Sequence, residues 1–271
     1  MSGVLERTLA ILELLSEQGQ GMELAAIAER LDIPKSAAHR LLAELLRCGY
    51  VRQLRDQGEY LLTTKLVSLG LSYLSKSGIV DIAQPLLDRL AEQSGELVRL
   101  AVVDGGRLTW VARAQGARQG LRYDPDMGSM ARLSCSSSGW AWLSTLKDDD
   151  ALALIAQQGL GQPQDFGPNA PKNLKAVLKA LHTTRQQGFA VTEETYTAGL
   201  NALAAPVRLA GQLAMGTISV AGPSARLTRA RMLTVAPDLL SCAAQLAAAS
   251  GASPLLVRGH GGPRLQPIYA P

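Results

Sequence analysis

The chain has 271 residues, of which 47% are hydrophobic and 4% aromatic, and its formal net charge is +4. This length suggests two domains, and the hydrophobic share is enough for sizeable cores filled mainly by aliphatic side chains. The three cysteines are far apart and odd in number, which argues against a disulfide framework and for reduced thiols. No apolar run is long enough to span a membrane and the N-terminus has no secretory pattern, so we expect a cytoplasmic protein with no membrane partner.

The most informative pattern lies near the N-terminus, after a helix predicted over residues 3–17. Apolar residues of 24–31 recur at i, i+3, i+4 and i+7, which predicts a second helix with one buried stripe. Pro34 marks the start of a third helix, because proline is tolerated at the first helical position. Residues 51–62 then form a hairpin-like segment that turns at 55–58. This order of helix, turn, helix and β-wing is typical of a domain that places one helix in the DNA major groove.

The helix after the turn has a polar face that suits DNA. Between residues 34 and 55 five basic residues stand against one acid, so positive charge gathers where the groove lies. Arg40 is the best candidate for a bidentate contact to guanine, whereas Lys35 and Ser36 suit phosphate. The simpler alternative is that these basic residues form an ordinary solvated helix face. For His39 both interpretations, a solvated surface residue and a DNA contact, stay open. The predicted DNA-contacting residues are Lys35, Ser36, His39, Arg40, Arg47, Arg52 and Arg55.

Residues 64–78 are predicted to form a linker helix. The stretch TKLVSLGLSYLSKS (64–77) is broadly apolar, with leucines and Tyr73 spread around the helix. Such a composition suits packing against another chain, and a simple intramolecular helix is the alternative. We therefore expect the chain to form homo-oligomers.

A second domain is predicted over residues 79–250. Two apolar strand-like runs are joined by Asp104-Gly105-Gly106, a hairpin turn signal. The full order is helix 81–94, strands 97–103 and 107–114, a short strand 121–123, helices 137–146, 149–158 and 172–187, strands 189–193, 202–209 and 212–221, and helix 228–249. Helices mixed with neighbouring hairpins predict an α+β domain with an antiparallel sheet. The chain then divides into a winged helix-turn-helix domain (1–63), the linker helix (64–78), the sensor domain (79–250) and a flexible tail rich in proline and glycine (251–271).

Five stretches together resemble the IclR family of transcriptional regulators. They are LERTLAILELLSE (5–17), IAERLDIPKSAAHRLLAELLRCGYV (27–51), LDRLAEQSGELVRLAVVDGG (87–106), GFAVTEETYTAGLNALAAPV (188–207) and ISVAGPSARLT (218–228). The resemblance covers nearly the whole chain, residues 3–250, and implies a winged helix-turn-helix and a GAF-like effector-binding domain. It also implies dimers, often paired into tetramers, that control genes for the catabolism of small carboxylates or aromatic compounds.

In such regulators the effector pocket lies between the sheet and a segment that corresponds here to LSCSSSGWA (133–141). The resemblance, together with the predicted helix start, places backbone N–H groups near Ser137 and Ser138 where an anion can bind. Ser219 matches a family pocket position. A plain N-cap in a polar loop is the alternative for the serine run. The predicted ligand-binding residues are Leu121, Met130, Ser137, Ser138, Ala202 and Ser219.

This segment and its surroundings depart from the family pattern. Ser134 stands where histidine is usual and Trp140 where lysine is usual. Ala202, Thr192 and Ala221 stand where a cysteine, an acidic residue and a serine often occur. These substitutions leave the predicted pocket with fewer polar side chains to bind a ligand. We therefore expect the effector to be an aromatic or extended carboxylate and not a small hydrophilic acid. For Trp140 two positions stay open, one lining the pocket and one packed beneath the helix.

No catalytic arrangement is predicted. The three histidines have no metal-ligand spacing, there is no G-x-S-x-G elbow or phosphate-binding loop, and Cys135 is expected to be an ordinary thiol. We expect no enzyme activity, no metal and no cofactor. The leading interpretation is a ligand-responsive regulator that binds a palindromic DNA operator and a carboxylate effector as a dimer or tetramer. The alternatives are a constitutive DNA-binding protein whose C-terminal domain serves only oligomerisation, and a hydrolase fused to a DNA-binding arm.

Overall fold

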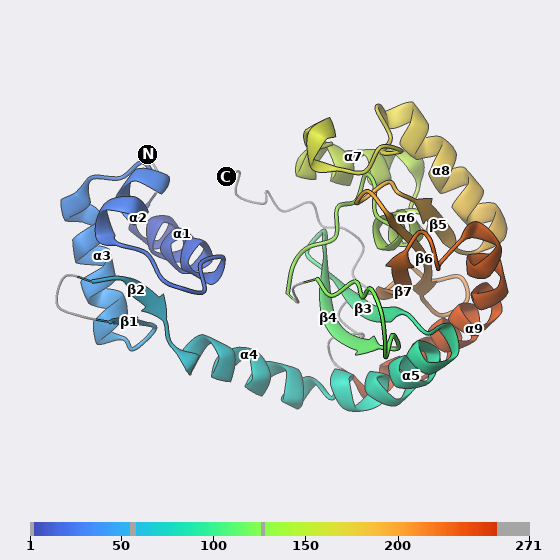
Figure 1. The fold of residues 1–271 in the computed structure, drawn as a ribbon, viewed down its shortest axis with the longest axis horizontal. Helices are drawn as coiled ribbons and strands as arrows, with labels where there is room; N and C mark the ends of the chain where they lie inside the picture. Colours follow the sequence, from blue (N-terminus) through green and yellow to red (C-terminus); the bar gives the residue numbers. More distant parts are fainter. Residues whose placement is uncertain (1–2, 55–57, 126–127, 254–271) are drawn as a thin grey trace. The chain divides into compact units, whose positions relative to one another are not determined.

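The structure, a computed structural model, describes residues 3–54, 58–125 and 128–253. The chain divides into two compact units, residues 1–76 and 77–271. Each unit has its own hydrophobic core, and Figure 1 shows the elements of both. Most of the predicted tail, residues 254–271, lies outside the described residues.

The first unit is a three-helix motif followed by a two-stranded wing. It contains α1 (Val4–Ser16), α2 (Leu24–Arg30), α3 (Lys35–Arg47), β1 (Val51–Gln53), β2 (Tyr60–Leu62) and α4 (Thr64–Ser77). Ile11, Ile27 and Leu42 are fully buried where the three helices meet, and Tyr60 of the wing closes the same core. Pro34 caps α3, which begins one residue later than predicted. The predicted helix-turn-helix with a β-wing is confirmed.

The last helix of this unit, α4, presents an apolar surface. Val67, Leu69, Leu71 and Tyr73 are each 51–61% exposed. Within α4 only Ser77, at its C-terminal end, is buried. The broad apolar distribution predicted from the sequence is therefore present on α4 and is not used for packing in the single chain.

The second unit is built on a five-stranded antiparallel sheet with the order β4-β3-β7-β6-β5. Its strands are β3 (Leu97–Asp104), β4 (Arg107–Gln115), β5 (Ala190–Glu193), β6 (Leu200–Val207) and β7 (Gly216–Pro223). Gly216 begins β7 at a close approach, because a Cβ there would lie 2.3 Å from the carbonyl oxygen of Ala101. The predicted α+β class and antiparallel sheet are confirmed.

Helices cover the sheet on two faces (Figure 1). α5 (Ile79–Ser94) and α9 (Arg229–Ala248) pack against each other and against one face. α6 (Ser137–Leu143), α7 (Asp148–Gln158) and α8 (Leu174–Gln187) belong to the other side, where α6 contacts β6 and β7. Short 3-10 turns, η1 (Pro163–Asp165) and η2 (Ser250–Ala252), complete the unit. Four of the six predicted pocket residues, Ser137, Ser138, Ala202 and Ser219, lie between α6 and the sheet.

Two sequence predictions in this unit were wrong. Residues 121–123 form no strand. They are held instead by side chains: Gln115 Nε2 donates to the Tyr123 carbonyl at 3.0 Å and Arg226 Nη2 to the Leu121 carbonyl at 3.1 Å. The helix predicted over 137–146 ends at Leu143, after only two turns.

The lengths and hydropathies of the helices bear on whether any of them could cross a lipid bilayer. Among the described residues no single helix is both long and apolar enough. Only α4 and α5 taken together reach the required length and hydropathy, and the two are separated by a sharp bend.

Candidate functional site

The outer face of α3 carries the predicted DNA contacts. Lys35, Ser36, His39 and Arg40 are exposed, while Leu42 on the opposite face is fully buried. In the described part of the chain, Lys35 and Arg40 make no side-chain hydrogen bond or ion pair, so their charges are available to a partner. The helix thus presents a polar surface that begins at its N-terminus, as a recognition helix does.

The remaining predicted contacts differ in their surroundings. Arg47 pairs with Glu44 at 2.6 Å on the exposed surface, and the hydrogen bond to Glu44 raises the pKa of Arg47. Arg52 is exposed on β1, opposite Leu61 of β2. Arg55 lies outside the described residues. Among the predicted contacts that the structure describes, Arg47 alone is engaged by another side chain of the protein.

A small cavity lies between α6 and the sheet in the second unit. Its free volume is about 20 Å³. The lining residues are Arg99, Trp110, Ser136, Ser137, Ser138, Thr192, Tyr196, Leu200, Ala202, Ser219 and Ala221. They come from the five strands, the loop between β5 and β6 and the start of α6, so the cavity is assembled from distant parts of the sequence.

Arg99 is the most unusual residue of this cavity. Its side chain is only 5% exposed, and burial lowers the pKa of the guanidinium. Its Nε has no hydrogen-bond partner, and no Asp or Glu of the described residues pairs with it. The guanidinium carbon lies 3.7 Å from the ring centroid of Trp110 and 5.7 Å from that of Tyr123. A buried cation is thus held by aromatic rings without a neutralising anion.

A second buried donor lines the same cavity. The indole Nε1 of Trp110, which is 2% exposed, has no hydrogen-bond partner in the described protein. The ring of Tyr196 meets Trp110 edge-on, with centroids 6.5 Å apart. Unsatisfied donors are rare in protein interiors, so two around one cavity indicate a place for an acceptor group.

Several hydroxyl groups of the lining are already hydrogen-bonded to the backbone. Ser136 Oγ accepts from the N–H of Gly139 at 3.0 Å, which caps α6 as the simpler alternative predicted. Thr192 Oγ1 donates to the Ala202 carbonyl at 3.1 Å, and Ser219 Oγ lies 3.5 Å from the Arg99 carbonyl. The strongest unmet hydrogen-bonding capacity of the cavity therefore belongs to Arg99 and Trp110.

The structure brings together four of the six residues predicted to bind a ligand. Ser137, Ser138, Ala202 and Ser219 all line the cavity. Leu121 and Met130 do not, since they are 73% and 47% exposed and lie outside its lining. Leu121 belongs to the segment that follows β4, and Met130 makes an isolated bridge to Thr109 of β4.

Trp140 packs beneath α6 and does not line the cavity. It is 7% exposed within the core formed by α6, α7 and α8, and its Nε1 donates to the Ser134 carbonyl at 3.0 Å. Ser134 and Trp140, which both depart from the family pattern, are thus joined by a hydrogen bond from the indole to the Ser134 backbone carbonyl. Of the two positions left open for Trp140, the structure has the packed one.

Sequence reasoning missed Arg99, Trp110 and Tyr196. A signal for Arg99 was present, because it is the only charged residue in the apolar run LVRLAVV (97–103), of which residues 97–102 are buried in β3. A charge inside a buried strand needs a partner or a function. Trp110 gave no such signal, because an aromatic residue in a strand is ordinary packing.

The buried thiols are poorly suited to nucleophilic chemistry. Burial raises the pKa of Cys135 to about 11 and that of Cys242 to about 12, so both stay protonated near neutral pH. Within the described ranges, no three His, Cys, Asp or Glu side chains are grouped to hold a metal ion.

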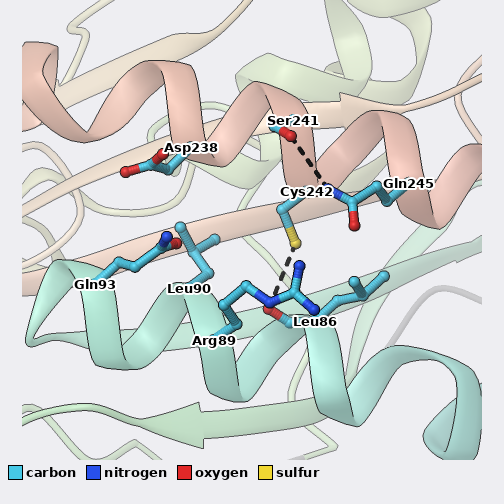
Figure 2. Close-up of a pocket in the computed structure, with 8 residues that line it drawn as sticks. All are labelled: Leu86, Arg89, Leu90, Gln93, Asp238, Ser241, Cys242 and Gln245. Atoms are coloured by element: carbon cyan, nitrogen blue, oxygen red, sulfur yellow. Dashed lines mark hydrogen bonds between the residues drawn. The ribbon is translucent and has the colours of Figure 1, made fainter.

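Figure 2 shows a second hollow, a groove between α5 and α9 of about 110 Å³. There the Cys242 thiol donates to the Leu86 carbonyl at 3.7 Å, and Gln245 Nε2 donates to Ser241 Oγ. Arg89 and Asp238 border the groove from opposite helices (Figure 2). These groups satisfy one another or face solvent, and they define no chemical site.

The fold, the exposed face of α3 and the cavity beside α6 together are typical of one class of protein. This class is a regulator that joins a DNA-binding winged helix to a small-molecule-binding domain. The chain belongs to the IclR family. The model described as the IclR helix-turn-helix domain matches residues 4–55, and the model of the bacterial transcriptional regulator IclR C-terminal domain matches residues 71–248. The protein is therefore a DNA-binding transcriptional regulator with an effector-binding domain.

Individual relatives agree with this assignment. The HTH-type transcriptional repressor AllR of Escherichia coli (strain K12) is 30% identical over 230 residues, covering 85% of this chain and 83% of the relative. An IclR transcriptional regulator from Alicyclobacillus acidocaldarius has the same fold, with a TM-score of 0.78, 21% identity and coverage of 92% and 98%. An IclR homolog from Microbacterium hydrocarbonoxydans, complexed with 4-hydroxybenzoate, gives a TM-score of 0.74 at 20% identity, covering 93% of this chain and 100% of the homolog.

Proposed function

We propose that the protein changes its affinity for an operator when a small organic acid binds at Arg99. The observation that carries this proposal is the buried guanidinium, whose Nε is unsatisfied and which has no acidic partner among the described residues. A buried donor without a partner costs about 1–3 kcal/mol, and more when it is charged. A carboxylate offers two in-plane oxygens to a guanidinium and removes that cost.

The rest of the cavity supports a carboxylate with an aromatic or extended apolar body. Leu200, Ala202 and Ala221 give the lining an apolar side, and Trp110 offers an indole ring. Ser137 and Ser138 stand beside these groups and are proposed to contact polar atoms of the ligand. The homolog crystallised with 4-hydroxybenzoate holds such a compound, which supports the same chemical class here.

A short aliphatic acid is the second candidate, and the volume of the cavity favours it. About 20 Å³ of free space accommodates little more than one water-sized group. An aromatic acid requires the lining to open, whereas an acid of two or three carbons requires a smaller rearrangement.

Calorimetry on the full chain tests the site. A panel of benzoate, 4-hydroxybenzoate, acetate and glyoxylate separates the two candidates by size. Arg99→Gln is expected to weaken binding of the preferred acid by about 10- to 100-fold, and Ala202→Phe to block it. Arg113→Gln is the matched control, because Arg113 stands opposite Arg99 on β4 but is half-exposed and paired with Asp124.

The outcomes are distinct. Equal losses in the Arg99 and Arg113 variants indicate a general effect of positive charge and contradict the site. Tighter binding of glyoxylate than of the aromatic acids overturns the aromatic ligand and leaves the acid-binding site. Operator affinity that no acid changes favours the constitutive DNA-binding protein.

For the DNA, we propose a palindromic site read by two copies of α3 in a dimer, in the bacterial cytoplasm. The exposed polar face of α3 supports direct contacts by Lys35, Ser36, His39 and Arg40, and Arg52 suits the DNA backbone. The repressor relatives support repression as the sign of regulation. Promoter fusions in cells with and without the protein measure that sign.

Dimerisation is proposed to use the apolar surface of α4 together with α1. Leu71 of α4 is 61% exposed and Leu5 of α1 is 71% exposed. Leu71→Glu is expected to shift the protein toward monomer in sedimentation and to weaken operator binding. A wild-type protein that is monomeric at micromolar concentration and binds DNA as a monomer contradicts this arrangement.

A further inference from the structure

The segment that follows β4 bears directly on Arg99. Residues 117–125, here called the strap, leave the edge strand and bring Tyr123 against the guanidinium, on which Trp110 also stacks. Tyr123 is half-buried, and burial is the main cause that raises the pKa of its hydroxyl. We propose that Trp110 and Tyr123 form an aromatic clamp on Arg99, that the strap is the part of the clamp that opens, and that binding of a carboxylate closes it. This rests on the proposed acid-binding role of Arg99.

The clamp leaves the edge of the guanidinium available. Trp110 lies close against the flat group, at 3.7 Å from its central carbon, so a ligand is excluded from that face. The unsatisfied Nε is on the edge, and Arg99 itself lines the cavity whereas Tyr123 does not. A carboxylate that approaches from the cavity therefore meets in-plane N–H donors, the geometry that favours bidentate pairing. The Tyr123 hydroxyl is hydrogen-bonded to the guanidinium, so Tyr123 positions Arg99 and leaves Nε for the ligand.

Apart from the Tyr123 ring, the strap is attached through side-chain contacts, one of which is the hydrogen bond from Gln115 Nε2 to the Tyr123 carbonyl at 3.0 Å. The strap contributes no strand to the sheet. The Arg113–Asp124 ion pair is 2.6 Å long, but its side chains are 43% and 50% exposed, and exposed pairs contribute little stability. Arg226 holds the Leu121 carbonyl while also forming two hydrogen bonds with Glu96. A segment held by side-chain contacts, without the backbone ladder that joins strands, opens more readily than the sheet beneath it.

The charge of Arg99 sets the direction of the coupling. Closing the strap removes water from a cation that has no anionic partner, which opposes closure in the absence of an acid. A bound carboxylate supplies the missing partner and reduces this opposition. By thermodynamic reciprocity, the closed strap then binds the acid more tightly. Closure of the strap and binding of the acid therefore favour each other.

Hydrogen exchange measured by mass spectrometry on the full chain tests this coupling, with saturating 4-hydroxybenzoate and, separately, glyoxylate as probes. We expect peptides from the strap to exchange about five- to tenfold more slowly with the acid that binds. Tyr123→Ala is expected to abolish this slowing and to weaken acid binding about tenfold. Tyr123→Phe keeps the ring but loses the hydrogen bond between the Tyr123 hydroxyl and Arg99, so it is expected to keep only part of the slowing.

Asp124→Asn is the matched control on the strap itself. It removes the exposed ion pair with Arg113 but leaves the clamp, so acid-dependent slowing should persist even if exchange without acid becomes faster. Binding heat without slowing, or faster exchange with acid, overturns the clamp and leaves the proposed function intact. Neither heat nor slowing with either probe overturns both proposals. Loss of slowing in the control as well as in Tyr123→Ala also contradicts the clamp.

Discussion

Replacing Arg99 with methionine should make the ligand-free protein more stable while it removes acid binding. Methionine fills much of the same volume without a charge, and position 99 is 5% exposed. Removing an unpaired buried cation recovers a desolvation penalty of several kcal/mol. The loss of cation–π contact with Trp110 and Tyr123 reduces this gain in stability by about 0.5–2 kcal/mol for each ring. The net expectation is a gain of about 1–2 kcal/mol in the free energy of unfolding.

The order of stability should then reverse when the acid is present. At an acid concentration of 100 times its Kd, the wild-type protein gains about 2.7 kcal/mol, whereas the variant without its anion partner gains almost nothing. Urea unfolding followed by circular dichroism, with and without the acid identified by calorimetry, measures both differences. A variant that is less stable without acid, yet still stabilised by the acid, would refute the idea that Arg99 is kept for its ligand.

Two further predictions concern DNA and pH. Arg40→Ala should weaken binding to the specific operator by about 1–3 kcal/mol and relax one base position, whereas Lys35→Ala should weaken all sequences alike and reduce the salt dependence. Quantitative mobility shifts on specific and random duplexes distinguish these outcomes. Hydrogen bonds first from His182 and then from Arg185 hold the pKa of Asp148 below its ordinary value. The stability from this carboxylate is therefore present above pH about 4 and lost as pH falls through the lowered pKa, so acid unfolding of Asp148→Asn should begin from a lower plateau and respond less to pH in that range.

The sequence was sufficient for the fold because its signals are local. Hydrophobic spacing in residues 24–31, the cap at Pro34 and the turn at 104–106 each specify a short element, and the structure contains all three. The boundaries of α6 were less accurate, since its helical pattern continues past Leu143 although the chain turns there. Local patterns thus predicted the type of each element better than its end.

The cavity was only partly predictable because it depends on contacts between distant strands. Ser137 and Ser219 were identified through the family resemblance, which carries three-dimensional information that periodicity lacks. Leu121 and Met130 were expected on the apolar side of the pocket, but both are exposed and lie outside its lining, because no local pattern shows which way such a loop residue faces. Arg99 required knowledge that no acid from another element reaches it, which only the folded structure provides.

The sheet order also has a consequence for the newly synthesised protein. Arg99 on β3 pairs in register with Ser219 on β7, and their hydrogen bond joins residues 120 positions apart in the chain. The ribosome therefore completes the DNA-reading unit well before it adds the strand that shelters this arginine. Domains fold as units, N-terminal first, so a nascent chain gains the ability to recognise DNA before it gains the ability to sense. The proposed acid site is therefore complete only at the end of synthesis, so an acid that binds there would stabilise the last part of the protein to fold.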